Sequence, residues 1–381
     1  MSNSRAILAD LVAFDTTSRN SNLPLQDYVR AKLAESGIEA ELFPDETGTK
    51  ANLFATIGPK GPGGIILSGH TDCVPVEGQA WSSDPFTLTE RDGKLYARGA
   101  ADMKGFLACA LAIVPALTKA QLSAPVHLAF SYDEETGCTG VRGMIKSLTA
   151  RGDRPAACLV GEPTGMGVVT GHKGGRSYRV FVTGTEAHSS LAPRAVNAIE
   201  YAAELIVFLR GLAAELKAGP QDQDYDVVHS TLSTGLIEGG TAINIVPNAC
   251  QFQFEFRNLP ATEQDDIAEQ VFGYARDTLL PQMRAVDPAC DIRFDQVYEY
   301  PAHVIEGDHP LVTRMKWAVG SNNQAKVAFG TEAGLFQRDL GVSTVVCGPG
   351  YIDVAHRPDE YVEQSQLDHC DVALAELLLN G

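Results

Sequence analysis

Apolar runs of strand length alternate with amphipathic segments in the first part of the chain and again near its end. Apolar residues at every third or fourth position predict helices over 5–14 and 25–37. Two short strands are expected over 38–43 and 52–58, and a helix over 104–117. Further strands, each ending near Gly, Asp, Glu or His, are expected over 63–70, 126–135, 156–163 and 343–350. Strands that alternate with helices in this way predict an α/β fold, with a mostly parallel sheet covered on both faces.

The pattern changes after His172, where strands alternate apolar and polar residues with a period of two. These strands and helices follow one another as strand 175–184, helix 192–216, strands 230–240 and 250–258, helix 261–280 and strand 290–300. The order β-α-β-β-α-β is that of a split, ferredoxin-like unit. The sequence therefore predicts an inserted domain over 175–300, within a larger domain made of 1–174 and 301–381.

Composition narrows the possible partners. Thirty basic against 48 acidic residues give a net charge of -18, which disfavours binding to nucleic acid and to anionic membranes. No run is long enough to span a bilayer, and the first apolar stretch lacks the features of a secretory signal. The eight cysteines show no paired spacing, so reduced thiols in a cytoplasm are expected.

Side chains that can bind metals follow the predicted strands of the larger domain. They are His70 with Asp72, Glu134 with Glu135, Glu162 and His356, together with Asp102 at the start of the next helix. Taken singly, such a histidine is more often structural, and paired glutamates are usually a solvated turn. Together they converge on the edge where such sheets bind their ligands, with one imidazole and one carboxylate for each of two metals and another carboxylate to bridge them.

Several segments then resemble one family. "GHTDCVP", "DPF", "GKLYARGAADMKG", "DEETG", "VGEPT", "TEAHSS" and "GPG" followed by "AHRPDEYV" look like those of the M20 metallopeptidases and deacylases, in family order over nearly the whole chain. Within the family, "FGTEAGLF" and "AHRPDEYV" look most like the members that deacetylate N2-acetylornithine. The resemblance implies a zinc-peptidase-like domain with an inserted lid that forms a dimer.

The resemblance also implies a role for each metal ligand. His70 and Glu162 would bind one divalent metal, Glu135 and His356 the other, and Asp102 would bridge the two. Ions in such sites lie about 3.5 to 4 Å apart. Zinc suits these nitrogen and oxygen ligands best, while cobalt and manganese stay open.

Two further carboxylates would act beside the metals. Asp72 is expected to accept a hydrogen bond from the second ring nitrogen of His70 and so to fix its tautomer. Glu134 is the candidate general base. It can share a site with Glu135 only if the strand has ended before them, because neighbouring strand residues point to opposite faces. The family also leads us to expect a cis peptide between Asp102 and Met103.

The remaining candidates would bind the substrate. By resemblance, His188 reaches the active site of the partner subunit and donates to the developing oxyanion, which requires a homodimer. Asn244 and Arg257 resemble the positions that hold the free carboxylate of a substrate. Thr331 and Glu332 lie where the subfamilies diverge, and Glu332 would repel a succinyl group and tolerate a cationic side chain.

Taken with this resemblance, the sequence leads us to expect a cytoplasmic amidohydrolase that acts on N2-acetyl-L-ornithine. Alternatives within the family are a succinyl-diaminopimelate desuccinylase and a dipeptidase or carboxypeptidase. A silent binding protein on the same fold would require the loss of ligands. A serine or cysteine nucleophile lacks the G-x-S-x-G motif that would support it.

Overall fold

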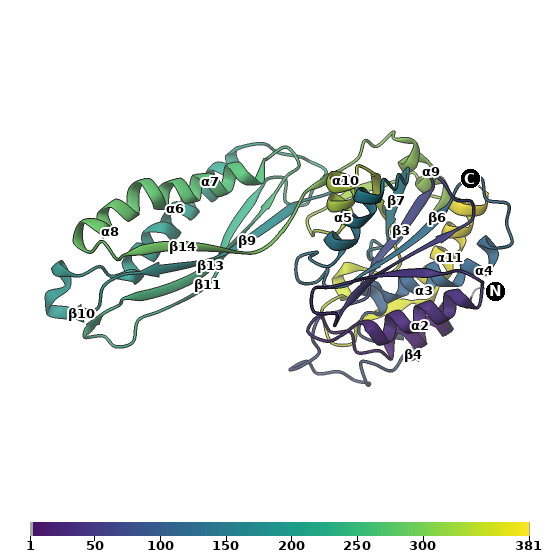
Figure 1. The fold of residues 1–381 in the computed structure, drawn as a ribbon, viewed down its shortest axis with the longest axis horizontal. Coiled ribbons are helices and arrows are strands. Elements are labelled where there is room, and N and C mark those ends of the chain that lie inside the picture. Colours follow the sequence, from purple (N-terminus) through teal and green to yellow (C-terminus); the bar gives the residue numbers. More distant parts are fainter. Residues whose placement is uncertain (1–2, 381) are drawn as a thin grey trace. The chain divides into compact units, whose positions relative to one another are not determined.

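The computed structural model describes residues 3–380, which form two compact units (Figure 1). The first unit runs up to Gly171, includes His303–Lys326 and resumes at Thr331. The second unit is His172–Ala302 together with Val327–Gly330. The inserted unit therefore begins three residues before the expected 175, ends two residues after the expected 300, and gains a short second segment.

The first unit is built on a nine-stranded sheet with a parallel centre. Its strands are β1 (Ala40–Pro44), β2 (Ala51–Ile57), β3 (Ile65–His70), β6 (Val126–Ser131), β7 (Ala157–Val160), β8 (Val168–His172), β15 (His303–Val304), β16 (Gln324–Val327) and β17 (Ser343–Val346). Their order is β1-β2-β6-β3-β7-β17-β8-β15, with β16 paired to β8. The four strands β6, β3, β7 and β17 run parallel, so their carboxyl ends meet at one edge. This confirms the predicted fold class.

Two groups of helices cover this sheet. The helices of the first unit are α1 (Ser4–Val12), α2 (Leu23–Ala34), α3 (Gly105–Ala112), α4 (Val114–Leu117), α5 (Val141–Arg151), α9 (Pro310–Ala318), α10 (Ala333–Asp339) and α11 (Gln364–Leu379). Helix α3 packs against α1 and α11, while α5 packs against α10 on the other side of the strands (Figure 1). Helix α3 is apolar around its whole circumference because neighbours cover every side of it.

One helical stretch corrects the expectation that no run could span a bilayer. Ala100–Leu117 is long and apolar enough to do so by length and composition alone. Within the structure, 83% of this window is buried in the protein. Its apolar character therefore matches its place as the central helix of the core.

The second unit is a four-stranded antiparallel sheet with helices on one face. Its main elements are β9 (Gly174–Thr183), α6 (Ala198–Ala218), β11 (Thr231–Gly239), β13 (Ala249–Asn258), α7 (Gln264–Tyr274), η3 (Ala275–Leu279), α8 (Leu280–Val286) and β14 (Asp291–Tyr300). The strand order is β11-β13-β9-β14, and the chain follows the predicted β-α-β-β-α-β sequence (Figure 1). Alternate residues of β13, such as Phe252, Phe254 and Phe256, are buried in the core of this unit.

The two helices of this unit differ in extent from the prediction. The first begins at Ala198 rather than 192, because the Asn197 side chain accepts hydrogen bonds from the backbone N–H groups of Ile199 and Glu200. Pro193 lies in the preceding 3-10 turn η2 (Ser189–Arg194). The second helical segment continues past 280 to Val286.

Short elements complete the two units. In the second unit, β10 (Ala187–His188) pairs with β12 (Ile245–Val246). In the first unit, β4 (Thr89–Arg91), β5 (Lys94–Tyr96) and β18 (Tyr361–Glu363) form a small sheet. Two turns frame the ligand loops, η1 (Ala100–Lys104) before α3 and η4 (Ile352–Val354) after β17.

Candidate metal centre

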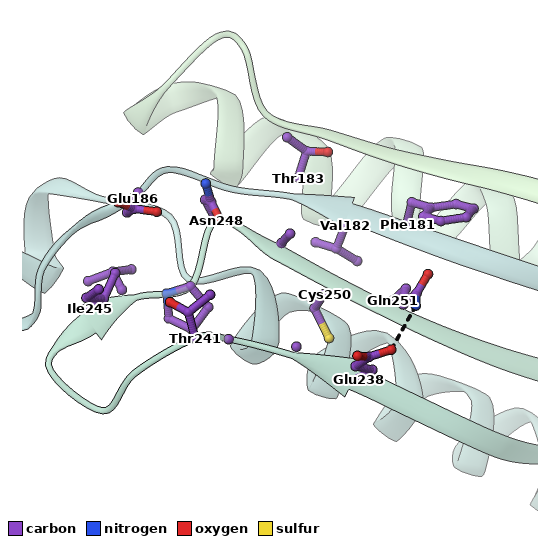
Figure 2. A pocket seen from close by; sticks show the side chains of 15 residues that line it. Phe181, Val182, Thr183, Glu186, Glu238, Thr241, Ile245, Asn248, Cys250 and Gln251 are labelled. Atoms are coloured by element: carbon purple, nitrogen blue, oxygen red, sulfur yellow. Dashed lines mark hydrogen bonds between the residues drawn. The ribbon is translucent and has the colours of Figure 1, made fainter.

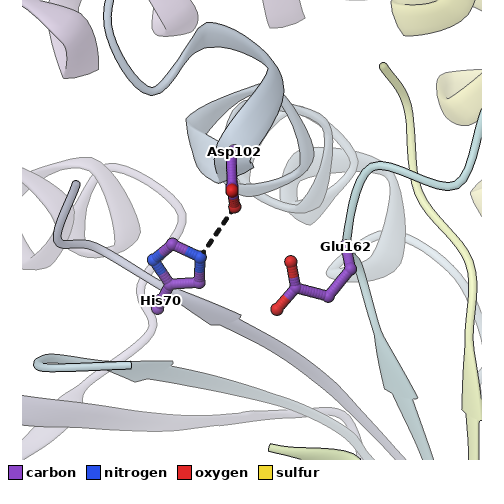
Figure 3. Close-up of side chains that lie close together, drawn as sticks. All are labelled: His70, Asp102 and Glu162. Carbon is purple, nitrogen blue, oxygen red and sulfur yellow. Dashed lines mark hydrogen bonds and ion pairs between the residues drawn. The ribbon is translucent and has the colours of Figure 1, made fainter. Parts of the chain in front are cut away.

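The five predicted metal ligands meet in the first unit, beyond the carboxyl ends of the parallel strands. They form two overlapping groups, His70 with Asp102 and Glu162, and Asp102 with Glu135 and His356. Within each group the ligand atoms all lie within 4.8 Å of one another. Figure 3 shows the first group, in which Asp102 and Glu162 approach the ring of His70 from different segments.

Asp102 lies at the junction of the two groups. Its Oδ1 is 3.0 Å from Nε2 of His70, and its Oδ2 is 3.3 Å from Nε2 of His356. The same nitrogen of His356 is 3.1 Å from Oε2 of Glu135. Each carboxylate oxygen of Asp102 thus faces a different imidazole, as a bridging ligand requires. The peptide between Asp102 and Met103 is cis, as the family resemblance predicted.

The electrostatics of these side chains favour a bound cation. Burial raises the pKa of Glu162, and burial together with the charge of Asp102 raises the pKa of Glu135 to about 7. Hydrogen bonds to Asp102 and Glu135 raise the pKa of His356 to about 10. Among the described residues, Oε1 of Glu135 is buried without a hydrogen-bond partner. Clustered carboxylates with an unpaired buried oxygen and two imidazoles fit divalent ions with mixed nitrogen and oxygen coordination.

Asp72 does more than orient His70. Nδ1 of His70 lies 3.0 Å from the backbone oxygen of Asp72 and 3.5 Å from its Oδ1, so the carbonyl is the nearer acceptor. The carboxylate accepts from the backbone N–H of Glu134 at 3.1 Å and of Glu135 at 3.3 Å, and from Oγ of Ser18 at 2.7 Å. Asp72 therefore also holds the turn that carries the candidate base and one ligand.

Glu134 has the environment of a general base. Strand β6 ends at Ser131, so Glu134 and Glu135 lie in a turn rather than on opposite faces of a strand. Burial raises the pKa of Glu134 well above its usual range; His70 opposes this shift, and the charge of Glu135 adds to it. A carboxyl group with a raised pKa can accept and return a proton near neutral pH.

Thr331 and Glu332 lie in the interior of the first unit, as deeply buried as the candidate ligand His70. Thr331 is 0% exposed, and its Oγ1 accepts from the backbone N–H of Ala333 at the start of α10. Glu332 is 1% exposed, with Oε2 3.4 Å from the hydroxyl of Ser68 in β3. Burial raises the pKa of Glu332 to about 7. The charge pattern did not indicate this burial.

The second unit carries the other three candidates at two separate places. His188 and Asn244 are neighbours, because His188 pairs with Ile245 and the backbone N–H of Ser189 donates to the oxygen of Asn244. Arg257 lies towards the opposite end of β13, opposite Gly175 of β9. Within one chain the structure therefore separates Asn244 from Arg257, which the sequence assigned to the same carboxylate.

The guanidinium of Arg257 has aromatic and acidic partners. Its Nη2 donates to Oε2 of Glu255 at 3.1 Å and to the hydroxyl of Tyr298 at 3.3 Å. Its central carbon lies 5.5 Å from the ring centre of Tyr300. These contacts hold the guanidinium in place while leaving part of the side chain open to solvent.

A separate pocket in the second unit contains none of the predicted site residues. It has a volume of about 310 Å³ and lies at the ends of β9, β11 and β13 (Figure 2). On one side, Nε2 of Gln251 donates to Oε2 of Glu238 at 3.1 Å. Among residues 3–380, both groups of clustered metal-binding side chains belong to the first unit, and none of their residues lines this pocket.

The family model for peptidase family M20/M25/M40 matches residues 66–380. The chain belongs to this family. Similar proteins of known function include the acetylornithine deacetylase of Myxococcus xanthus, 37% identical over 97% of this chain and 95% of that protein. The acetylornithine deacetylase of Photorhabdus laumondii is 34% identical over 96% of this chain and 92% of its own length. This M20 protein is therefore a metal-dependent hydrolase of amide bonds.

Solved structures share the fold. An M20 metallo-carboxypeptidase from Sulfolobus solfataricus superposes with a TM-score of 0.79 at 20% identity, covering 99% of this chain and 98% of the other. A Bacillus subtilis protein described as a dinuclear metal-binding peptidase of the M20 family gives a TM-score of 0.65 at 16% identity, covering 98% and 96%. At these identities the likeness establishes the fold alone.

Three residues that contact the backbones of the candidate ligands, or one another beside them, were missed in the sequence. Arg98 and Glu360 are fully buried and lie within the quoted segments "GKLYARGAADMKG" and "AHRPDEYV". Gln79 lies outside every quoted segment. The available signal was a charged residue four positions before Asp102 and another four positions after His356, but sequence alone does not distinguish a buried charge from an exposed one.

Proposed function

We propose that this M20 protein hydrolyses the amide bond of N2-acetyl-L-ornithine to acetate and L-ornithine, as in arginine biosynthesis. The proposal is carried by the convergence of five candidate ligands, with Glu134 close enough to feel the charges of His70 and Glu135. The chain is also similar over nearly its whole length to acetylornithine deacetylases. The desuccinylase and dipeptidase alternatives would use the same centre and are outcomes of the test below.

Two divalent ions, preferably zinc, would be held by the two side-chain groups that share Asp102. When bound, they would polarise the amide carbonyl and lower the pKa of water. The protein itself holds the ligands in place, since Asp72 fixes the turn of Glu134 and Glu135 and its backbone oxygen orients His70.

Glu134 would move the proton. As the carboxylate, it takes a proton from the attacking water while the water oxygen forms its bond to the acetyl carbon. The bond between that carbon and the amine nitrogen then breaks, and Glu134 delivers the proton to the departing amine. The raised pKa of Glu134 suits both halves of this transfer.

The second unit would contribute to two different active sites of a homodimer. Along β13, Arg257 is eight residues from Ala249, which adjoins the β10–β12 pair that carries His188. At about 3.4 Å per residue this is about 27 Å, far longer than an acetylated amino acid. Arg257 and the pair His188 and Asn244 of one chain therefore cannot contact one substrate. We assign Arg257 to the carboxylate in its own subunit, and His188 of the partner subunit to the developing oxyanion.

The surface of the second unit supports pairing with a second copy. Strand β11 is an edge strand of the four-stranded sheet, and Leu236 and Ile237 on it are 68% and 56% exposed. Helix α6, which packs against β11, exposes Val207. Proteins rarely leave a long apolar edge strand open, because it would pair with other chains. We propose that β11 and α6 form the homodimer contact.

We also propose a cytoplasmic location. All eight cysteines are free and buried, which suits a reducing compartment. The net charge of -18 likewise argues against nucleic acid and anionic membranes as partners.

Product analysis tests the substrate. The purified protein is incubated with N2-acetylornithine, N-succinyl-diaminopimelate and a dipeptide panel, with chelator or with added zinc, cobalt or manganese. We expect metal-dependent release of acetate with the highest kcat/KM for acetylornithine. Faster release of succinate or faster cleavage of dipeptides would overturn the substrate assignment. The matched variant Glu134→Gln should lower kcat by about 10²- to 10⁴-fold while still binding metal.

Mixing inactive variants tests the shared site. Glu134→Gln and His188→Ala are each expected to be nearly inactive, yet a mixed dimer has one intact site, made of Glu134 from one subunit and His188 from the other. After equal mixing and random subunit exchange, about a quarter of all sites should be intact. Mixed samples that stay as inactive as the separate variants, despite proven exchange, would show that His188 does not act across the dimer.

A further inference from the structure

A buried ion pair lies beside the metal centre and is not part of the ligand set. Arg98 is 0% exposed and Glu360 is 1% exposed, and Nη1 of Arg98 donates to Oε2 of Glu360 at 2.7 Å. Arg98 precedes Asp102 by four residues, and Glu360 follows His356 by four. The pair thus joins the two chain segments that bring Asp102 and His356 to the same metal group.

Glu360 holds the backbone that carries the bridging ligand. Its second oxygen, Oε1, accepts from the backbone N–H of Ala101 at 2.9 Å and of Asp102 at 3.1 Å. Because these amides lie in the turn before α3, the main α-helical hydrogen bonds do not satisfy them. The position of the Asp102 backbone therefore depends on the position of the Glu360 carboxylate.

Arg98 extends the contacts to the second imidazole ligand. Its Nη2 donates to Oε1 of Gln79, and Nε2 of Gln79 donates to the backbone oxygen of His356 at 3.1 Å. His356 has a φ of 62°, in the left-handed region that non-glycine residues seldom adopt. A hydrogen bond to its carbonyl helps to hold this backbone, and with it the direction of the imidazole. Trp81 fixes Gln79 in turn, since its Nε1 donates to Oε1 at 3.0 Å.

These contacts form one unbroken chain from the Asp102 backbone through Glu360, Arg98 and Gln79 to the backbone of His356. Both ends of the chain are ligands of one group, the one that also contains Glu135. The other group shares only Asp102 with it. A disturbance at the Gln79 end would therefore affect one metal site and spare the other.

We propose that Arg98, Glu360 and Gln79 are positioning residues that set the affinity of the metal site formed by Asp102, Glu135 and His356. The proposal rests on the proposed function only in assuming that both groups bind divalent ions. Residues that orient metal ligands typically change metal affinity by about 10- to 100-fold when they are removed. Gln79 is the most informative of the three, because it is only partly buried and touches His356 but not Asp102.

The test compares Gln79→Met with Gln337→Met. Gln337 is a matched control in the same unit: its Nε2 donates to the oxygen of Val304 at 2.7 Å, and none of its hydrogen-bond partners is a metal ligand. Metal-free samples are titrated with cobalt, and binding is followed by elemental analysis and by the visible absorption spectrum of each bound ion. Melting of the metal-free proteins is measured alongside.

We expect Gln79→Met to weaken one of the two binding steps by about 10- to 100-fold and to change the spectrum of that ion, with the other step unchanged. Gln337→Met should leave both steps as in the original protein. Glu360→Gln, which disturbs the bridging ligand, should weaken both steps. Unchanged binding and spectra in Gln79→Met, or an equal change in Gln337→Met, would overturn the proposal.

The failure of the proposed function has a different result. If the unaltered protein binds two ions with the predicted dependence on Gln79 but releases no acetate from acetylornithine, the substrate assignment fails and the positioning role stands. If the unaltered protein binds fewer than two ions, the two-metal centre itself is wrong, and the positioning proposal falls with it.

Discussion

Replacing Asp72 by Asn tests how the metal centre is held together. The substitution preserves shape but exchanges one carboxylate oxygen for an amide NH₂ group. Oδ1 of Asp72 accepts from the backbone N–H of Glu134, and Oδ2 accepts from Ser18 and from the backbone N–H of Glu135. An asparagine that keeps its oxygen towards Glu134 must point its NH₂ group at the N–H of Glu135.

The magnitude follows from these contacts. The hydroxyl of Ser18 can rotate and accept from the new NH₂ group, so that contact survives the change. The buried N–H of Glu135 cannot, and a buried donor without an acceptor costs about 1–3 kcal/mol. This corresponds to a loss of about 5- to 150-fold in kcat/KM, in metal affinity, or divided between the two. Loss of the charge near His70 acts in the same direction.

The assay measures kcat/KM for acetylornithine at saturating metal and, separately, metal affinity, for Asp72→Asn and for Ser18→Ala. Ser18→Ala removes the hydroxyl that donates to Asp72 but leaves the backbone N–H groups of Glu134 and Glu135 bonded to the carboxylate. It should therefore lower kcat/KM and metal affinity by less than about fivefold. An Asp72→Asn protein with unaltered kcat/KM and metal affinity would refute the reasoning. Equal losses in both variants would show that the backbone amides are not what matters.

Three further predictions concern protonation and packing. Burial raises the pKa of Glu135 to about 7 in the metal-free protein. The protonated carboxyl group therefore stabilises the folded state at low pH, and this stabilisation is lost as the pH rises from about 4.5 through 7. Metal binding at pH 6 should therefore release protons, and calorimetric heats that do not vary with the buffer would contradict this. Burial lowers the pKa of His303 to about 4, so the unfolded state binds more protons than the folded state between pH 6.5 and 4. The free energy of unfolding should therefore fall by about 2 kcal/mol between pH 7 and 5. Urea unfolding should show a smaller fall for His303→Gln, and an equal fall in both proteins would contradict the prediction. At Gly161 a Cβ would lie 1.9 Å from the Phe106 ring, so Gly161→Ala should lower the free energy of unfolding by about 1–3 kcal/mol. At Gly143, in helix α5, a Cβ would have no atom within 4 Å, so Gly143→Ala should raise it by about 0.5–1 kcal/mol in the same urea unfolding measurement.

The sequence allowed us to predict which edge of the sheet carries the site, because the length of a strand and the residue types at its end are local properties of the sequence. His70 is the last residue of β3 and Glu162 follows β7 by two residues, and the carboxyl ends of parallel strands share one edge. The order β6-β3-β7-β17 was not predicted, since the pairing of strands far apart in the chain leaves no local trace. The helix start at Ala198 was mispredicted because the apolar pattern continues upstream of it, although Asn197 was available as a capping signal.

Burial was the main property that the sequence did not reveal. Glu332 was predicted to repel a succinyl group and to tolerate a cationic side chain. It directly precedes α10, and its side chain lies against Ser68 in the interior, a burial that the charge argument did not include. Asn244 and Arg257 were both assigned to the substrate carboxylate, but within one chain Asn244 lies beside the β10–β12 pair and Arg257 towards the far end of β13. In both cases the residue type suited the assigned chemistry, but the sequence held no information on the tertiary arrangement around the residue.

The acidic residues near the centre outnumber the metal ligands, and the structure shows why. Asp72 binds the consecutive backbone N–H groups of Glu134 and Glu135, and Glu360 binds those of Ala101 and Asp102. A ligand in a turn is not restricted to one face of a strand or helix, so its side chain can point towards the metal. The backbone N–H groups of the turn, however, have no partners from a strand or helix. A buried carboxylate, which itself needs donors, satisfies two of them at once. Two of the acids in the motifs therefore bind the backbone rather than a metal, a division of roles that residue type alone does not reveal.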